Sequence, residues 1–230
     1  QRLWRGQTIT ARDGAGKPCE LRILPRPIQP EPPIWLTCSG DPQMFVKAGE
    51  LGFNVLTALL SQSVEEMAGK LKLYRDARER HGHDPDAGRV TVMIHTFVGD
   101  DEQSVLSRVR APLSDYLKAH VGLIETMTQS LDIKVNIDKE QYLDHLVAFA
   151  FERYYQTASL IGTPEKCLPM VERLKAVGVN ELACFIDFGV EVEAVLGGLR
   201  HLNTLRQLST SRRAVEGAGA ESRGSMSQTA

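Results

Sequence analysis

The sequence predicts an α/β protein built as half of a (β/α)8 barrel, with four parallel strands that each precede one or more helices. Short apolar runs alternate with longer segments of helical periodicity along the 230 residues. Strands that are apolar on both faces occur in parallel sheets covered by helices. A doubly wound domain could also use four strands, but no G-x-G-x-x-G turn follows the first one. We therefore expect parallel strands near 34–38, 55–60, 90–97 and 181–188, adjacent in that order.

The number of strands is half of what a closed barrel needs. A complete barrel has eight strands and usually about 250 residues. The first residue is Gln1 rather than Met, so we expect the amino-terminal half of the barrel to lie upstream. Ahead of the first strand, residues 9–24 predict a β-hairpin around a Gly-rich turn. The prolines between Pro25 and Pro33 predict an extended connector, because each fixes φ and restricts the residue before it.

The helices are predicted from apolar periodicity and from their capping residues. We expect them at 42–51, 64–80, 101–120, 121–130, 138–158, 164–177 and 193–208. Asp41 with Pro42, and Thr163 with Pro164, are typical pairs at a helix start. From Ser209 onward almost nothing is apolar, so residues 209–230 are predicted to be a disordered tail or linker after a barrel domain at 1–208.

Composition restricts the class of partner. The formal charge is −2 and the pI is near 6.3, which gives no electrostatic reason to expect nucleic acid or an anionic membrane as partner. No apolar run reaches the 18 residues that a membrane-spanning helix needs. The four cysteines lie far apart and form no C-x-x-C pair. They predict reduced, buried thiols in a cytoplasmic protein, with no zinc site.

Several segments carry a more specific signal. They are Pro25-Arg26-Pro27-Ile28-Gln29-Pro30 with Ile34-Trp35-Leu36-Thr37, then Ala48-Gly49-Glu50-Leu51-Gly52 with Leu56-Thr57, Tyr74-Arg75, and Leu160-Ile161-Gly162-Thr163-Pro164-Glu165. They resemble the luciferase-like monooxygenase family over nearly all of residues 1–208. In that family the proline-rich segment leads into the fifth barrel strand, so the four predicted strands correspond to strands five to eight.

Two further segments, Ile94-His95-Thr96-Phe97-Val98-Gly99 and Ala183-Cys184-Phe185-Ile186-Asp187-Phe188-Gly189, resemble a branch of this family found in peptide and polyketide biosynthesis. That branch is usually assigned FMN rather than F420. The resemblance implies a monooxygenase that uses reduced FMN and O2 on a small or carrier-tethered intermediate of secondary metabolism. A flavin reductase would supply the reduced FMN, unless it is reduced in place.

The segment Ser39-Gly40-Asp41-Pro42-Gln43 follows a predicted strand and opens a helix. At the carboxyl face of a barrel, backbone N–H groups and a helix dipole favour a phosphate. The family binds its flavin phosphate at these positions, so the resemblance implies Ser39, Gly40 and Gln43 as cofactor-binding residues. Luciferases proper carry a Glu-Ser pair where this chain has Ser-Gly. A plain helix cap is the alternative interpretation.

His95 is the only histidine in a predicted strand. It is either a hydrogen-bonded core residue or a contact to substrate or flavin, because the carboxyl ends of barrel strands face the active site. Gln62, and Asp187 with Gly189, lie on the same predicted rim. The family's catalytic histidine belongs to the second barrel strand, upstream of this chain, so no catalytic residue is assigned.

Two other functions stay open. One is an F420-dependent dehydrogenase on the same barrel, and the other is a non-catalytic half-barrel that serves as a scaffold. In either case an open half-barrel is expected to expose inward-facing apolar side chains, including some of Trp35, Leu36, Val92, Ile94 and Phe185.

Overall fold

A parallel sheet forms the centre of the structure, a computed structural model that describes residues 1–120 and 139–224. Its strands are β3 (Trp35–Thr37), β4 (Asn54–Ala58), β5 (Val90–Val98), β6 (Leu160–Gly162) and β7 (Glu181–Phe185). β3, β4 and β5 are adjacent in that order, and β7 pairs with β5 along its first part. The four predicted strands and their sequential, parallel order are confirmed. The sheet does not close into a barrel, so the fold is a partial barrel.

β6 is a strand that the sequence analysis does not predict. It pairs in parallel with the last residues of β5, and all three of its residues are buried. The segment Gly162-Thr163-Pro164-Glu165 is interpreted above only as the start of a helix. A strand of three residues is too short to show a periodicity of two, which explains why the pattern missed it.

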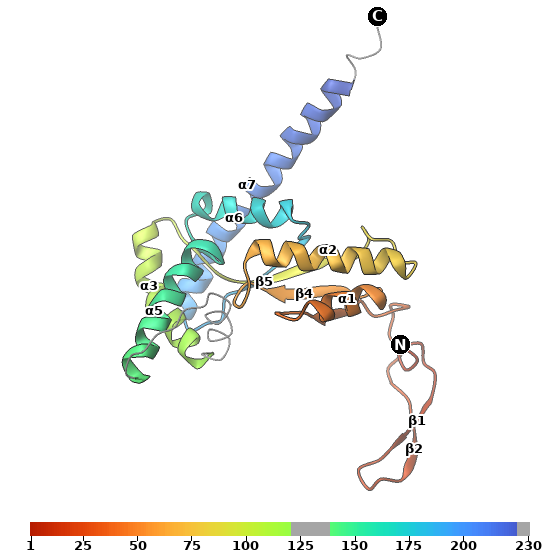
Figure 1. The fold of residues 1–230 in the computed structure, drawn as a ribbon. Helices are drawn as coiled ribbons and strands as arrows, with labels where there is room; N and C mark the ends of the chain where they lie inside the picture. Colours follow the sequence, from red (N-terminus) through yellow and green to blue (C-terminus); the bar gives the residue numbers. More distant parts are fainter. Residues whose placement is uncertain (121–138, 225–230) are drawn as a thin grey trace, which may run out of the picture.

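Helices cover one side of the sheet and the carboxyl ends of the strands (Figure 1). They are α1 (Pro42–Glu50), α2 (Val64–Arg80), α3 (Glu102–Ala119), α5 (Lys139–Thr157), α6 (Pro164–Ala176) and α7 (Val192–Gly224). The side chains of Asp41, Ser63, Asp101 and Thr163 each accept a backbone N–H at a helix start, which confirms the two predicted caps. The predicted helix at 121–130 lies outside the described residues.

Helix α7 is longer than the sequence predicts. It continues to Gly224, whereas the predicted helix ends at Leu208. The alanine, arginine and glutamate residues between Ser209 and Gly224 favour helix by their intrinsic propensity, so this part of the helix needs no apolar face. The division between a barrel domain at 1–208 and a tail at 209–230 stays a prediction.

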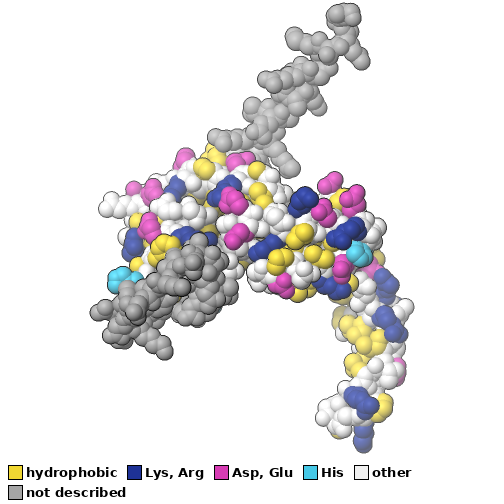
Figure 2. Space-filling model, in the orientation of Figure 1, with side chains coloured by type: hydrophobic (Ala, Val, Ile, Leu, Met, Phe, Trp, Pro, Cys, Tyr) yellow, Lys and Arg dark blue, Asp and Glu magenta, His cyan; other side chains and the backbone are white. Residues whose placement is uncertain are grey.

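The amino-terminal segment forms an arm that projects from the sheet (Figure 1). β1 (Ile9–Arg12) and β2 (Pro18–Leu21) pair antiparallel, which confirms the predicted hairpin. Apolar side chains gather along this arm beside arginine and lysine side chains (Figure 2). Leu24 and Ile28, in the proline-rich connector, are 70% and 101% exposed.

The two faces of the sheet differ in what covers them. In a parallel pair, residues in register point to the same side. Val55, Val92 and Ile94 are fully buried and belong to the face that packs against helices. The other face, which would line a barrel, carries half-buried residues such as Trp35 and Phe185. Of the residues from which some were predicted to be exposed inside the barrel, Val92 and Ile94 are not exposed, because strand alternation places them outward.

Leu36 likewise faces the helices rather than the barrel interior. It alternates with Trp35 and Thr37 along β3, and it packs against the helix-covered core. Trp35 and Phe185 keep the predicted inward position, with partly exposed side chains.

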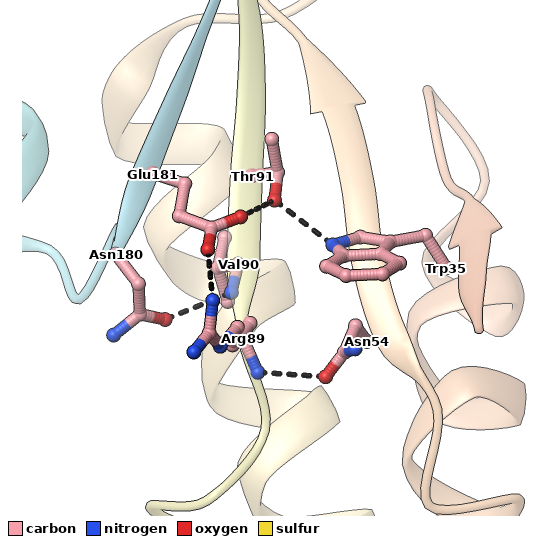
Figure 3. Close-up of polar contacts among 7 residues, drawn as sticks. All are labelled: Trp35, Asn54, Arg89, Val90, Thr91, Asn180 and Glu181. Carbon is pink, nitrogen blue, oxygen red and sulfur yellow. Dashed lines mark hydrogen bonds and ion pairs between the residues drawn. The ribbon is translucent and has the colours of Figure 1, made fainter. Parts of the chain in front are cut away.

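A polar network ties the amino-terminal ends of the strands together on the inward face (Figure 3). The indole of Trp35 reaches across β4 and donates to Thr91 Oγ1 at 2.9 Å. The Thr91 hydroxyl donates to Glu181 Oε2 at 2.9 Å, and Arg89 pairs with the other carboxylate oxygen. The network therefore joins β3, β5 and β7. This end of a barrel supports stability, whereas the opposite end carries chemistry.

Candidate functional site

The predicted site residues lie at the carboxyl ends of the strands. Ser39 and Gly40 follow β3, Gln62 lies just beyond β4, and Asp187 follows β7. His95 lies within β5, three residues before it ends. These positions share the rim on which barrel enzymes build their active sites.

The turn before α1 is exposed on this rim. Ser39, Gly40 and Gln43 are all exposed, and a Cβ placed on Gly40 would meet no atom within 4 Å. A ligand group can therefore approach the backbone at Gly40 closely. The Asp41 carboxylate accepts the backbone N–H of Gln43 at 2.9 Å, so this N–H already has a partner. The structure thus supports the plain helix cap, and it leaves the Ser39 hydroxyl and Gln43 side-chain amide exposed on the rim.

Lys70 adds a positive charge that the sequence analysis missed. Its ammonium donates to Gln62 Oε1 at 2.8 Å, from α2 to the loop after β4. Desolvation lowers the pKa of Lys70, while the charges of Glu66 and Asp41 oppose that shift. The charge of Asp41 acts on this ammonium, which makes Lys70 a candidate cation for a ligand bound at the turn that precedes α1. Hydroxyl, amide and ammonium donors together fit a phosphate group.

Gln62 is a support for Lys70 rather than an open ligand contact. Its side chain is 2% exposed, and its amide nitrogen donates to Thr57 Oγ1 and to the Ala58 carbonyl. Both polar atoms of the Gln62 side chain are already hydrogen-bonded. Gln62 lies at its predicted place on the rim, and its amide oxygen positions Lys70.

His95 is surrounded by a cluster of aromatic side chains. It is fully buried, and its Nδ1 lies 2.9 Å from the hydroxyl of Tyr154 on α5. The rings of Tyr116, Phe185 and Phe188 also contact it edge to face. Burial, with a smaller contribution from the charge of His120, lowers the pKa of His95 to about 4. His95 is therefore a neutral, hydrogen-bonded core residue in this structure.

The rim groups are not all brought together. Ser39, Gly40 and Gln43 lie together after β3, and Lys70 contacts the loop after β4. Asp187 is exposed beyond β7, and Gly189 after it has a φ of 100°, which favours glycine in that turn.

Two negative findings concern the described residues. The described ranges, 1–120 and 139–224, hold no group of three or more histidine, cysteine or acidic residues that could bind a metal ion. Within the same residues, no helix is long and apolar enough to cross a membrane. All four cysteines are free, and burial raises the pKa of the Cys38 thiol to about 11.

Comparison with known families decides the class. Residues 1–181 match the model of the luciferase-like monooxygenase family. The chain belongs to this family. The match confirms the resemblance drawn from the proline-rich segment and from the strand–helix joins. No curated protein gives a significant match to the sequence.

Solved structures support the same fold. The monooxygenase RslO1 from Streptomyces bottropensis is 18% identical, with a TM-score of 0.60, over 87% of this chain and 55% of that one. An F420-dependent secondary alcohol dehydrogenase is 16% identical, with a TM-score of 0.55, over 86% of this chain and 56% of that one.

The oxygenating constituent of 3,6-diketocamphane monooxygenase from Pseudomonas putida, in complex with FMN, is 16% identical. Its TM-score is 0.53, over 80% of this chain and 53% of that one. The chain therefore spans about half the length of these luciferase-like neighbours.

Proposed function

We propose that this chain is the carboxy-terminal part of a flavin-dependent monooxygenase that uses reduced FMN and O2. Membership of the luciferase-like monooxygenase family carries the proposal. The exposed turn at Ser39, Gly40 and Gln43 supports the proposal. Its side chains can donate hydrogen bonds to a phosphate group, and the backbone at Gly40 is open to close approach. When bound, FMN would supply the oxygen chemistry, and the protein would bind, orient and shield it.

The substrate in this proposal is a small or carrier-tethered intermediate of secondary metabolism. The segments around His95 and Asp187 support this class through their resemblance to the branch from peptide and polyketide biosynthesis. The missing partner is the amino-terminal half of the barrel, which would complete the wall around the flavin. A flavin reductase and a carrier protein are the further partners of the same proposal.

An F420-dependent dehydrogenase is the second candidate. It is supported by the F420-dependent secondary alcohol dehydrogenase among the structural neighbours, whose TM-score is close to those of the monooxygenases. Titration with FMN and with F420, followed by cofactor fluorescence, separates the two when the chain is co-expressed with the amino-terminal half of the barrel. The variants described below are measured in the same complex. Tighter binding of FMN supports the monooxygenase, and tighter binding of F420 contradicts it.

Gly40 provides the first variant that tests the phosphate site. Gly40→Val should weaken FMN binding without unfolding the chain, because the added side chain meets no protein atom but fills the approach to the backbone. Gly14→Val is the matched control: a Cβ at Gly14 also meets nothing within 4 Å, and the residue lies in the hairpin arm. Equal FMN affinity in the two variants would place the phosphate elsewhere.

Lys70 provides a second variant pair. Lys70→Met removes the ammonium near the turn and should weaken FMN binding more than riboflavin binding, because riboflavin carries no phosphate. Lys72→Met is the control, since Lys72 lies on the same helix and pairs with Asp76 in solvent. An equal effect of Lys70→Met on FMN and riboflavin would rule out a phosphate contact.

A further inference from the structure

Nε2 of His95 is a buried side-chain atom without a hydrogen-bond partner among the described residues. The residue is 0% exposed, so solvent does not reach it in this structure. Buried polar atoms in native proteins almost always have a partner, and an exception calls for an explanation. In register with Phe185, His95 lies on the face of the sheet that would line a barrel.

The Tyr154 contact indicates which ring nitrogen carries the proton. If the Tyr154 hydroxyl donates to Nδ1, both of these atoms are satisfied and the proton resides on Nε2. If Nδ1–H donates instead, the phenol proton has no acceptor within this pair, and Nε2 keeps an unused lone pair. The first arrangement leaves one unpaired atom, and the second leaves two. The Nε2–H tautomer is therefore favoured.

Among the described residues, the side chains in contact with the His95 ring are uncharged, and the charge of His120 acts on the ring through a weaker interaction. Tyr116, Tyr154, Phe185 and Phe188 surround the imidazole with aromatic rings. Burial raises the pKa of Tyr154 and of Tyr116, so both phenols stay neutral, as does the imidazole. A carboxylate or an ammonium placed here would lose its hydration without a counter-charge.

We propose that Nε2–H of His95 binds an uncharged hydrogen-bond acceptor, a carbonyl oxygen, on an otherwise apolar part of the substrate. The inference rests on the proposed function, because it assigns the substrate class of that same barrel. The imidazole acts as a binding group, and Tyr154 is a positioning residue that fixes its tautomer. A single donor among aromatic rings selects for an apolar molecule with one acceptor.

Two of the rings that contact His95 are only half-buried. Tyr116 on α3 stacks on His120 with ring centroids 4.2 Å apart, and Phe185 is the last residue of β7. Removing the Tyr116 ring would take away one of the groups that cover the imidazole. A smaller side chain at position 116 should therefore make binding easier.

The test uses the full 230-residue chain labelled with ¹⁵N in its histidine rings. The probes are acetophenone, which carries a carbonyl, ethylbenzene, which lacks an acceptor, and benzoate, which is charged. We expect the His95 Nε2 resonance to be that of a protonated nitrogen, and acetophenone alone to shift it to saturation. Tyr116→Ala should lower the acetophenone concentration needed for half-saturation.

Three outcomes would overturn the inference. The first is a proton on Nδ1 instead of Nε2. The second is an Nε2 resonance that acetophenone leaves unchanged in both the wild type and Tyr116→Ala. The third is equal shifts from acetophenone and ethylbenzene, which would make His95 a core residue whose N–H faces an aromatic ring.

Ligand-observed NMR on His95→Phe and His95→Gln completes the test. His95→Phe should lose acetophenone binding, whereas His95→Gln, which keeps an N–H donor, should retain part of it. FMN fluorescence is measured separately, on the chain co-expressed with the amino-terminal half of the barrel. Failure of that complex to bind FMN would count against the flavin proposal, while the acetophenone result alone judges the His95 inference.

Discussion

His95 links the stability of the fold to pH. Its pKa is about 4 in the folded chain, against an ordinary value of 6.5. Between these values the unfolded chain binds a proton that the folded chain does not. The stability associated with a neutral His95 is therefore complete above about pH 6.5 and is lost as the pH falls towards 4, by up to about 3 kcal/mol. The groups that face the ring are Tyr116 and His120 on α3 and Tyr154 on α5.

Urea unfolding of the wild type and of His95→Gln checks this coupling. We expect the wild type to lose more free energy of unfolding than the variant between about pH 7 and about pH 4.5, because glutamine does not titrate. His201→Gln, which changes a histidine on α7 outside the aromatic cluster, is the control. Equal losses in the wild type and in His95→Gln would show that His95 does not govern the acid response.

The site could be predicted from the sequence only in part. The turn at Ser39 and Gly40 was found because a strand end and a helix cap are adjacent in the chain. His95 was found because it is a polar residue in an apolar strand, but the aromatic rings around it come from α3, α5 and β7. Lys70 was missed because its partner Gln62 lies eight positions earlier, across the start of a helix. A lysine on a helix otherwise indicates only a solvated face.

At the scale of the elements, β5 organises the sheet because it pairs with three other strands. The first residues of this nine-residue strand pair with β4 and β7, and its last residues pair with β6. Long β-branched runs made this strand predictable. β6 and the extension of α7 were not predictable, because three residues carry no period and the segment beyond Ser209 has no apolar stripe.

The network of Trp35, Thr91 and Glu181 should stabilise the amino ends of the strands. Thr91→Val keeps the shape of the side chain but removes the hydroxyl that accepts from Trp35 and donates to Glu181. We expect a loss of about 1–3 kcal/mol in the free energy of unfolding, since partly buried partners are left unpaired. Chemical denaturation measures this loss. Thr37→Val, at an exposed position of β3, is the control and should change stability little. A loss no larger than the control's would mean that the network contributes nothing.

At the scale of the whole molecule, the open sheet presents strands with a free edge in the described sheet order. β3 pairs only with β4, and β6 and β7 each pair only with β5. Unpaired strand edges invite association with another chain. The start of α7 adds to this surface: Val192 and Leu196 are 68% and 56% exposed. In a closed barrel the strands and helices of the other half would cover both regions.

The half-barrel itself was predictable from the count of strand–helix units and from the family resemblance. Which side chains face inward was not fully predictable, since strands that are apolar on both faces give no alternation by which to orient Val92 and Ile94. The register with β4 and β7 decides their orientation.

Sedimentation velocity of the 230-residue chain, alone and with FMN, tests directly whether the chain is an open half-barrel. The account predicts that the chain alone forms dimers or aggregates, since its inward face and strand edges are uncovered, and that it retains little FMN. Co-expression with the upstream half should give a single compact species that is yellow with bound flavin. A monomer of the chain alone that binds FMN tightly would contradict the half-barrel account.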